Sequence, residues 1–367
     1  MKIACTGGGT GGHIFPGIAV IDELKRLEDA IEVVWIGSGK ELERGITSRF
    51  GIPYYAVPAG KLRRYFSIQN VFDVFKIAAG IAYSIILLKR LKIELLFSKG
   101  GYVAVGPVLA AWILRIPVIT HESDCDPGLA TRIISRFAET ILLPYERTRV
   151  EHFGSSVKDV RVTGNPVRGE LFRASGERGR NILHIGPEKS LVLVLGGSQG
   201  ARQINRLIGE IRDELLDEAA VVHQMGSLDF VSSETDNYIT APFFDSEFPD
   251  ILAAADLVIS RAGAGTVWEN GVLAKASILI PLGSGSSRGD QLRNAGLFEE
   301  EGAAVMLSGQ DANGRELLKQ SRTLLRDPEA MNRMKRNAAR ICNPDAGEKI
   351  ARIIIERVRS VKRGVPQ

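Results

Sequence analysis

One local pattern occurs twice in this chain: an apolar strand, a glycine-rich turn and an apolar-periodic helix. The first copy runs from a strand at 2–5 through the turn at 7–12, where five of six residues are glycine, into a helix expected to begin near Phe15. The second copy runs from a strand at 191–195 into a turn that begins at Gly196. Strand-like and helical segments alternate around both copies, which is typical of a parallel sheet covered by helices on both faces. The repeat predicts an α/β protein with two doubly wound domains.

The other expected elements follow the same alternation. In the first half, strands are expected at 2–5, 32–36, 54–57, 94–98, 117–120, 140–143 and 160–162. In the second half, strands are expected at 191–195, 219–223, 239–243, 257–260, 278–281 and 303–307, followed by helices at 312–326, 328–341 and 346–362. A charged stretch at 168–190 interrupts the pattern. Because 367 residues suit two domains, we expect domains at 1–165 and 166–345, with a C-terminal helix in 346–367 packing back on the first.

Each glycine turn is suited to hold phosphate, because the backbone can approach the ligand and the helix N–H groups point at it. Gly7, Gly9 and Gly12 also match the dinucleotide fingerprint G-x-G-x-x-G. That interpretation requires a carboxylate at the end of the second strand, where none stands. Ser38 and Lys40 would suit a phosphorylated ribose there, so an NAD(P)-dependent dehydrogenase stays open. Two glycine turns facing one cleft favour a transferase with two phosphate-bearing ligands.

Charge and cysteine content narrow the class further. A net charge of only +4 gives no reason to expect a nucleic-acid partner. Cys5, Cys125 and Cys342 are odd in number and far apart, which favours reduced thiols over disulfides or a zinc site. The chain enters a strand at once and has no run of about 18 apolar residues, so we expect no signal peptide and no spanning helix.

Seven motifs in order carry a resemblance to a known family. They are GGGTGGHIFPGIAV, KGGYVAVGPVLAA, HESDCDPGL, GNPVR, GGSQGA, RAGAGTVWE and DQLRNA. Together they resemble the N-acetylglucosaminyltransferases that complete lipid II for peptidoglycan. The resemblance implies the GT-B fold, two Rossmann-like domains facing a cleft. It implies UDP-N-acetylglucosamine (UDP-GlcNAc) as donor and lipid I, the undecaprenyl-diphosphate-linked muramoyl-pentapeptide, as acceptor. Alternatives are a GT-B enzyme that glycosylates diacylglycerol and a catalytically silent nucleotide-sugar sensor.

The resemblance also implies which residues bind the donor. Arg168 and Ser198 would hold its diphosphate, and Phe244 would present backbone groups to the uracil. Gln291 would bind the hydroxyls of the sugar. The uridine would lie against the segment made of Ala264, Gly265, Thr266, Val267, Trp268 and Glu269. Within it, Glu269 would accept from the ribose hydroxyls. We also expect Glu269 in the first turn of its helix, where a carboxylate could merely cap that helix.

On the acceptor side the resemblance implies that Thr10, Gly11 and Gly12 border the diphosphates. Members of the family invert the anomeric centre, so the muramoyl 4-hydroxyl must lose a proton to a base. His13 is the candidate, because the positive end of a helix favours the neutral imidazole that can accept a proton. A phosphate ligand or a capping side chain is the other interpretation of His13.

Asp124 departs from the family pattern, which usually has asparagine at this position. An ionised carboxylate cannot donate a hydrogen bond and repels a diphosphate, so Asp124 either accepts from a sugar hydroxyl or lies away from phosphate. It could also share the role of base with His13. Asp124 and Asp126 spell D-x-D, a metal motif of other glycosyltransferases, but so short a match arises easily by chance. We expect no catalytic metal and no cofactor.

The helix expected at 68–91 is apolar on two faces. Val71, Val74, Phe75, Ala78, Ala82 and Ile85 share one face, and Phe72, Ala79, Tyr83 and Ile86 line another. Basic residues flank it, including Arg63, Arg64, Lys89 and Arg90. Burial in a core would explain both faces. A lipid-linked acceptor instead favours peripheral binding at the cytoplasmic leaflet of the cell membrane, where basic residues meet anionic lipid.

Overall fold

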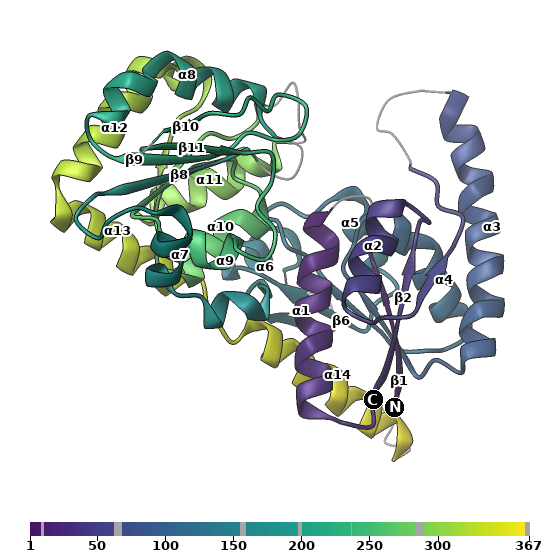
Figure 1. Cartoon of the computed structure of the whole chain (residues 1–367). Helices are drawn as coiled ribbons and strands as arrows, with labels where there is room; N and C mark the ends of the chain where they lie inside the picture. Colours follow the sequence, from purple (N-terminus) through teal and green to yellow (C-terminus); the bar gives the residue numbers. More distant parts are fainter. Residues whose placement is uncertain are drawn as a thin grey trace. The chain divides into compact units, whose positions relative to one another are not determined.

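The chain divides into two compact units, shown as a computed structural model in Figure 1. Unit 1 comprises Met1–Val167 with Pro344–Gln367, and unit 2 comprises Arg168–Asn343. The structure describes residues 1–8, 11–61, 68–154, 159–196, 200–235, 237–283 and 289–363. Each unit contains one sheet built mainly of parallel strands.

In unit 1 the sheet has the order β3-β2-β1-β4-β5-β6-β7, with every pair parallel. Its strands are β1 (Lys2–Thr6), β2 (Glu32–Gly37), β3 (Tyr54–Ala56), β4 (Leu95–Ser98), β5 (Val118–His121), β6 (Thr140–Leu143) and β7 (Val160–Val162). Its helices are α1 (Gly11–Leu27), α2 (Glu41–Arg49), α3 (Ile68–Leu91), α4 (Val105–Ile113), α5 (Leu129–Ile134), α6 (Glu146–His152) and α14 (Ala346–Lys362). The strand order reverses beside β1, and ligands of open α/β sheets bind at such a point.

The C-terminal helix α14 belongs to unit 1 and lies beside α1 (Figure 1). Ile350, Ile354 and Val358 are fully buried in the same core as Ile14 and Ile18 of α1. At the surface Arg26 and Glu348 join the two helices with an ion pair of 2.6 Å. Burial of this apolar stripe, rather than the exposed ion pair, supplies most of the stabilisation.

In unit 2 the order is β10-β11-β9-β8-β12-β13-β14, with only β10 antiparallel among the described pairs. The strands are β8 (Leu191–Leu195), β9 (Ala220–Gln224), β10 (Glu234–Thr235), β11 (Tyr238–Ala241), β12 (Leu257–Ser260), β13 (Ala276–Leu279) and β14 (Val305–Met306). The helices are α7 (Gly176–Leu183), α8 (Arg202–Leu216), α9 (Phe248–Ala254), α10 (Ala264–Val272), α11 (Asp290–Glu300), α12 (Gly314–Arg326) and α13 (Pro328–Ile341). The strand order reverses beside β8, so the second glycine turn also stands at a switch point.

Two expectations about elements were wrong. The stretch at 168–190 contains a helix, α7, whose N-terminus is capped by Ser175 accepting from the N–H of Arg178 and which ends at His184 with φ +54°. The first helix begins at Gly11, not near Phe15, and therefore contains Pro16. A proline usually indicates the first residue of a helix, but here burial of Ile14 favours the extra turn.

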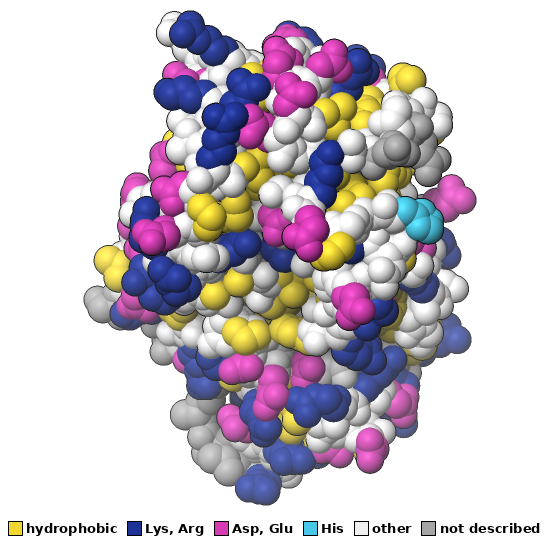
Figure 2. Space-filling view, turned by 60° about the vertical axis from the view of Figure 1, so that its left-hand side comes forward, with side chains coloured by type: hydrophobic (Ala, Val, Ile, Leu, Met, Phe, Trp, Pro, Cys, Tyr) yellow, Lys and Arg dark blue, Asp and Glu magenta, His cyan; other side chains and the backbone are white. Residues whose placement is uncertain are grey.

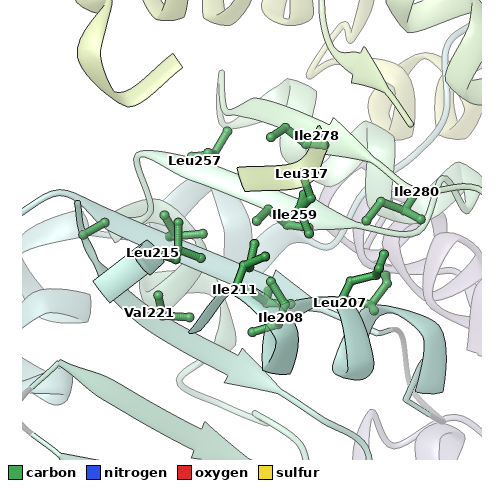
Figure 3. Close-up of a cluster of buried hydrophobic side chains, with 14 of the residues drawn as sticks. Leu207, Ile208, Ile211, Leu215, Val221, Leu257, Ile259, Ile278, Ile280 and Leu317 are labelled. Carbon is green, nitrogen blue, oxygen red and sulfur yellow. The ribbon is translucent and has the colours of Figure 1, made fainter. Parts of the chain in front are cut away.

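Packing in unit 2 centres on the inner face of α8, where Leu207, Ile208, Ile211 and Leu215 point at the sheet (Figure 3). They meet Val221, Ile259 and Ile278 of the strands. Because Ile211 is only 4% exposed, Ile211→Ala removes well-packed methyl groups. We expect a loss of about 2–5 kcal/mol in the free energy of unfolding, measured by urea denaturation. A loss below about 1 kcal/mol would contradict this packing.

Candidate active site

The first glycine turn follows β1 at the switch point of unit 1. Gly7 is required there because a Cβ on it would lie 3.0 Å from the Cβ of Lys99, just beyond β4. Gly11 and Gly12 form the first two residues of α1, so their N–H groups are free of intrahelical partners. Thr10 lies outside the described residues. At the described start of α1, N–H groups therefore remain that could face an anion.

His13 is the third residue of α1 and is half-buried. Its Nδ1 lies 3.2 Å from the main-chain carbonyl oxygen of Lys99. A carbonyl only accepts, so Nδ1 carries the proton and Nε2 is left with a lone pair. Nε2 lies 3.4 Å from where a Cβ on Gly101 would stand, and Gly101 has φ +78°. A side chain at position 101 would therefore press against the ring nitrogen that can accept a proton.

The loop after β5 is organised by a buried carboxylate that the motif did not single out. Glu122 is 4% exposed and accepts from the N–H groups of Ser123 at 2.7 Å, Asp124 at 3.1 Å and Gly128 at 3.2 Å. Asp124 itself is half-buried. These three hydrogen bonds hold the main chain of the loop around Glu122 and so fix the position of Asp124.

Asp126, the second carboxylate of the D-x-D pattern, forms an ion pair with Arg132 and lies near His152. Arg132 lies 3.0 Å and His152 3.5 Å from its Oδ1. No group of three or more His, Cys, Asp or Glu side chains that could hold a metal ion is found among the residues described. These partners favour a structural role for Asp126.

Glu43 of α2 is a second buried carboxylate missed from the sequence. It is 1% exposed and accepts from the Ser38 N–H at 2.6 Å, the Ser38 hydroxyl at 2.8 Å and the Tyr54 hydroxyl at 2.7 Å. It occupies the space that a side chain on Gly8 would need. Ser38, considered for a phosphorylated ribose, thus bonds to Glu43 beneath the glycine turn.

In unit 2, α10 begins directly after the loop that follows β12. Gly263 at its N-cap provides no side-chain cap, so the N–H groups of Ala264, Gly265 and Thr266 are available to a ligand. Val267 and Trp268 are 1% and 0% exposed, so their side chains pack inside and only their main chain can face a ligand.

Glu269 is the sixth residue of α10, and the first turn of that helix contains no acidic residue. The expectation that Glu269 lies in the first turn was therefore wrong, and Glu269 does not cap α10. Its carboxylate instead lies 2.9 Å from Nε of Arg168, with both side chains only 16% exposed. The guanidinium of Arg168 also stands over the ring of Phe248, 4.8 Å from its centre. Two residues expected to bind the donor are therefore adjacent.

The remaining donor candidates belong to other segments of unit 2. The N–H of Phe244 donates to Oε1 of Gln224 at 3.0 Å, which narrows its expected contact with the uracil to the carbonyl. Gln291, in the first turn of α11, accepts from the N–H of Leu282 at 3.0 Å through its amide oxygen. Ser198 lies outside the described residues. Gly200 nearby has φ +79° and no room for a side chain beside Met225.

Charged side chains of both signs are interspersed over the face shown in Figure 2, with hydrophobic side chains between them. This mixture agrees with the small net charge of +4.

The described chain combines two doubly wound units, a glycine turn at each switch point and an adjacent arginine–glutamate pair. That combination agrees with the GT-B fold of nucleotide-sugar hexosyltransferases that the sequence motifs imply.

Comparisons identify the family within this class. Residues 3–143 match the glycosyltransferase family 28 N-terminal domain, and residues 191–354 match its C-terminal domain. A transferase of Treponema pallidum is 47% identical over 86% of this chain and 85% of its own length. One from Treponema denticola is 42% identical over 98% of this chain and 97% of its own length. One from Clostridium perfringens is 40% identical over 91% of this chain and 93% of its own length. The chain belongs to the family of these relatives, the UDP-N-acetylglucosamine–N-acetylmuramyl-(pentapeptide) pyrophosphoryl-undecaprenol N-acetylglucosamine transferases.

Solved structures agree with this assignment. The crystal structure of MurG from Acinetobacter baumannii is 25% identical, with a TM-score of 0.74 over 97% of this chain and 99% of its own. UDP-GlcNAc 2-epimerase from Neisseria meningitidis, solved with UDP-GlcNAc, shares the fold with a TM-score of 0.70 at 16% identity, over 97% of this chain and all of its own. The predicted fold, family and enzyme class are confirmed, and the dehydrogenase interpretation was wrong.

Proposed function

We propose that the chain transfers GlcNAc from UDP-GlcNAc to the 4-hydroxyl of the muramoyl sugar in lipid I, with inversion at the anomeric carbon. The observation that carries the proposal is the family assignment, because relatives at 40–47% identity bear the name of this reaction. The side chains described above are of the types that the reaction requires. One unit offers a histidine that can act as a base, and the other offers an arginine, helix amides and a carboxylate that can accept from a ribose hydroxyl.

On the donor side, the free amides of α10 and the carboxylate of Glu269 would bind uridine. Arg168, by its charge, and Ser198, by a hydrogen bond from its hydroxyl, would stabilise the negative charge that grows on the departing diphosphate, and this favours the transition state over the ground state. Arg168 already lies against Glu269, so one guanidinium can bridge the ribose end and the phosphate end of the donor. Gln291 would orient the sugar through its amide.

On the acceptor side, Nε2 of His13 would take the proton of the attacking hydroxyl. Donation from Nδ1 to the carbonyl of Lys99 keeps the ring in the tautomer that this role requires. The N–H groups of Gly11 and Gly12, with Thr10, would bind acceptor diphosphate. Asp124 would accept from a sugar hydroxyl. No metal or cofactor takes part in this scheme.

The experiment follows label from UDP-GlcNAc in three parallel reactions: with lipid I, with diacylglycerol and without acceptor. We expect label in the lipid I reaction alone. Transfer to diacylglycerol would instead establish the related lipid glycosyltransferase. Binding of UDP-GlcNAc without any transfer would establish a nucleotide-sugar sensor, and either outcome would overturn the proposal.

We also propose that unit 1 binds the cytoplasmic leaflet of the membrane through α3. No described helix is long and apolar enough to span a bilayer. The helix meets its own unit through Gly80, Ser84 and Leu87, and Gly80 is required because its Cβ would collide with the carbonyl of Pro58. Its large exposed side chains are Phe72, Val74, Phe75, Tyr83 and Ile86, with Lys76, Lys89 and Arg90 also exposed. The core thus covers one narrow face, and both apolar stripes expected from the sequence contribute to the outer surface.

The double substitution Phe72→Ser/Phe75→Ser should weaken binding to vesicles rich in anionic lipid by about 10-fold or more, because these rings are 64% and 69% exposed. Cosedimentation with vesicles measures it. Leu228→Ser is the matched control, since that side chain is 83% exposed on unit 2. Equal binding of both variants would rule out α3 as the membrane contact.

A further inference from the structure

Lys99 is a buried lysine of unit 1; it begins the KGGYVAVGPVLAA motif, but the resemblance gives it no role. It follows β4, is 2% exposed, and its Nζ lies 2.6 Å from Nδ1 of His121 and 2.5 Å from the hydroxyl oxygen of Ser123. Nε2 of His121 lies 2.9 Å from the carbonyl oxygen of Gly164, so this nitrogen carries the proton and Nδ1 accepts from the lysine. The lysine thus donates into the loop that presents Asp124.

The same residue holds His13 through its main chain. The carbonyl of Lys99 accepts from Nδ1 of His13 at 3.2 Å, and the Cβ of Lys99 lies beneath Gly7 of the first glycine turn. Ser123, in turn, donates to Oδ1 of Asn165 at 3.1 Å, which fixes the other side of the loop. Lys99 therefore connects His13, the proposed base, with the loop segment that carries Asp124.

Burial and nearby carboxylates have opposite effects on the charge of Lys99. The titratable groups that face it are His121, Glu122 and Asp124 from the β5 loop and His13 from α1. Burial lowers the pKa of Lys99 to about 7, against the attraction of Glu122 and Asp124. Burial and the nearby Lys99 lower the pKa of His121 well below its usual value, so that ring stays neutral.

We propose that Lys99 is a positioning residue of the acceptor site: it holds the Ser123–Asp124 segment and His13 in one arrangement that binds the acceptor sugar. This inference rests on the proposed function. It adds that acceptor affinity, and not donor affinity, depends on a side chain that no substrate touches. The ammonium form holds the loop more strongly than the neutral amine, because charge-assisted hydrogen bonds are about twice as strong as neutral ones.

Lys99→Met tests the proposal, since methionine fills a similar volume without a donor. We expect kcat/KM for lipid I to fall about 30-fold near pH 6 and about fivefold near pH 8.5, where the wild-type amine is neutral. The KM for UDP-GlcNAc should change less than about twofold, because unit 2 is untouched. Ser123→Ala should give a smaller loss in the same direction, and combined with Lys99→Met it should add little.

Lys275→Met is the matched control, because Lys275 is a mostly buried lysine of unit 2 whose Nζ donates to the carbonyls of Ala253 at 2.6 Å and Ala255 at 2.9 Å. It should lower the melting temperature without the pH-dependent loss in kcat/KM for lipid I. If Lys99→Met does not fold, Ser123→Ala alone tests the proposal: kcat/KM for lipid I should fall while the KM for UDP-GlcNAc stays nearly unchanged. Equal losses for both substrates, or a Lys99→Met loss that does not vary with pH, would overturn the inference. Failure of the wild type to use lipid I would instead overturn the proposed function.

Discussion

His13→Ala is expected to lower kcat about 10²- to 10⁴-fold while the dissociation constant for UDP-GlcNAc changes less than about threefold. The structure gives the physical reason: Nδ1 is engaged with the Lys99 carbonyl, and Nε2 is the ring atom left to accept a proton. Loss of the ring removes the proton acceptor and leaves the donor site of unit 2 unchanged. Initial rates with saturating lipid I, with isothermal titration of the donor, measure both quantities.

His13→Asn sharpens this test, because its amide can still donate to the Lys99 carbonyl but is a poor base. It should fold at least as well as His13→Ala and show a similar loss of kcat. If His13→Asn kept most of the wild-type kcat, the imidazole would serve as a hydrogen-bonding or phosphate-binding group. A parallel loss of UDP-GlcNAc affinity in either variant would likewise indicate that the imidazole binds a ligand instead of accepting a proton.

Glu269→Ala should raise the dissociation constant for UDP-GlcNAc about 10- to 100-fold, because it removes an ionised acceptor for the ribose hydroxyls. It also leaves the mostly buried Arg168 without its 2.9 Å partner, so the melting temperature should fall as well. Isothermal titration with UDP and UDP-GlcNAc measures the first effect, and calorimetry the second.

Glu269→Gln separates the two effects. The amide keeps an oxygen toward Arg168 and a weaker acceptor for the ribose, so affinity should lie between the wild type and Glu269→Ala. Donor affinity that is unchanged in both variants would restrict Glu269 to its ion pair with Arg168.

Much of the fold could be predicted because buried parallel strands are read as short apolar runs. Residues 191–195 are all apolar, and the corresponding strand β8 is buried throughout. The start of α1 and the position of Glu269 in α10 were misjudged because small residues surround both helix starts. Glycine and alanine do not show whether a turn or a helix has begun, and tertiary packing decides. The two-residue strand β10 is too short to carry a periodic pattern.

The buried charges of the acceptor side could not be predicted, because their partners are distant in sequence. Glu43 lies two residues after Glu41 in the same helix, and nothing in the sequence distinguishes the buried carboxylate from the exposed one. Lys99 left one signal, a charged residue directly between a buried strand and two glycines. Its bonds to His121 and Ser123 depend on the pairing of β4 with β5, which a single sequence does not state.

We propose that this chain joins GlcNAc to the 4-hydroxyl of lipid I with inversion. The most direct measurement is the structure of the glycolipid made from UDP-GlcNAc and lipid I, determined by NMR of the isolated disaccharide. We predict a β-1,4-linked product formed by the wild type and nearly absent with His13→Ala. An α-linked product, attachment at another hydroxyl or no glycolipid at all would contradict the account.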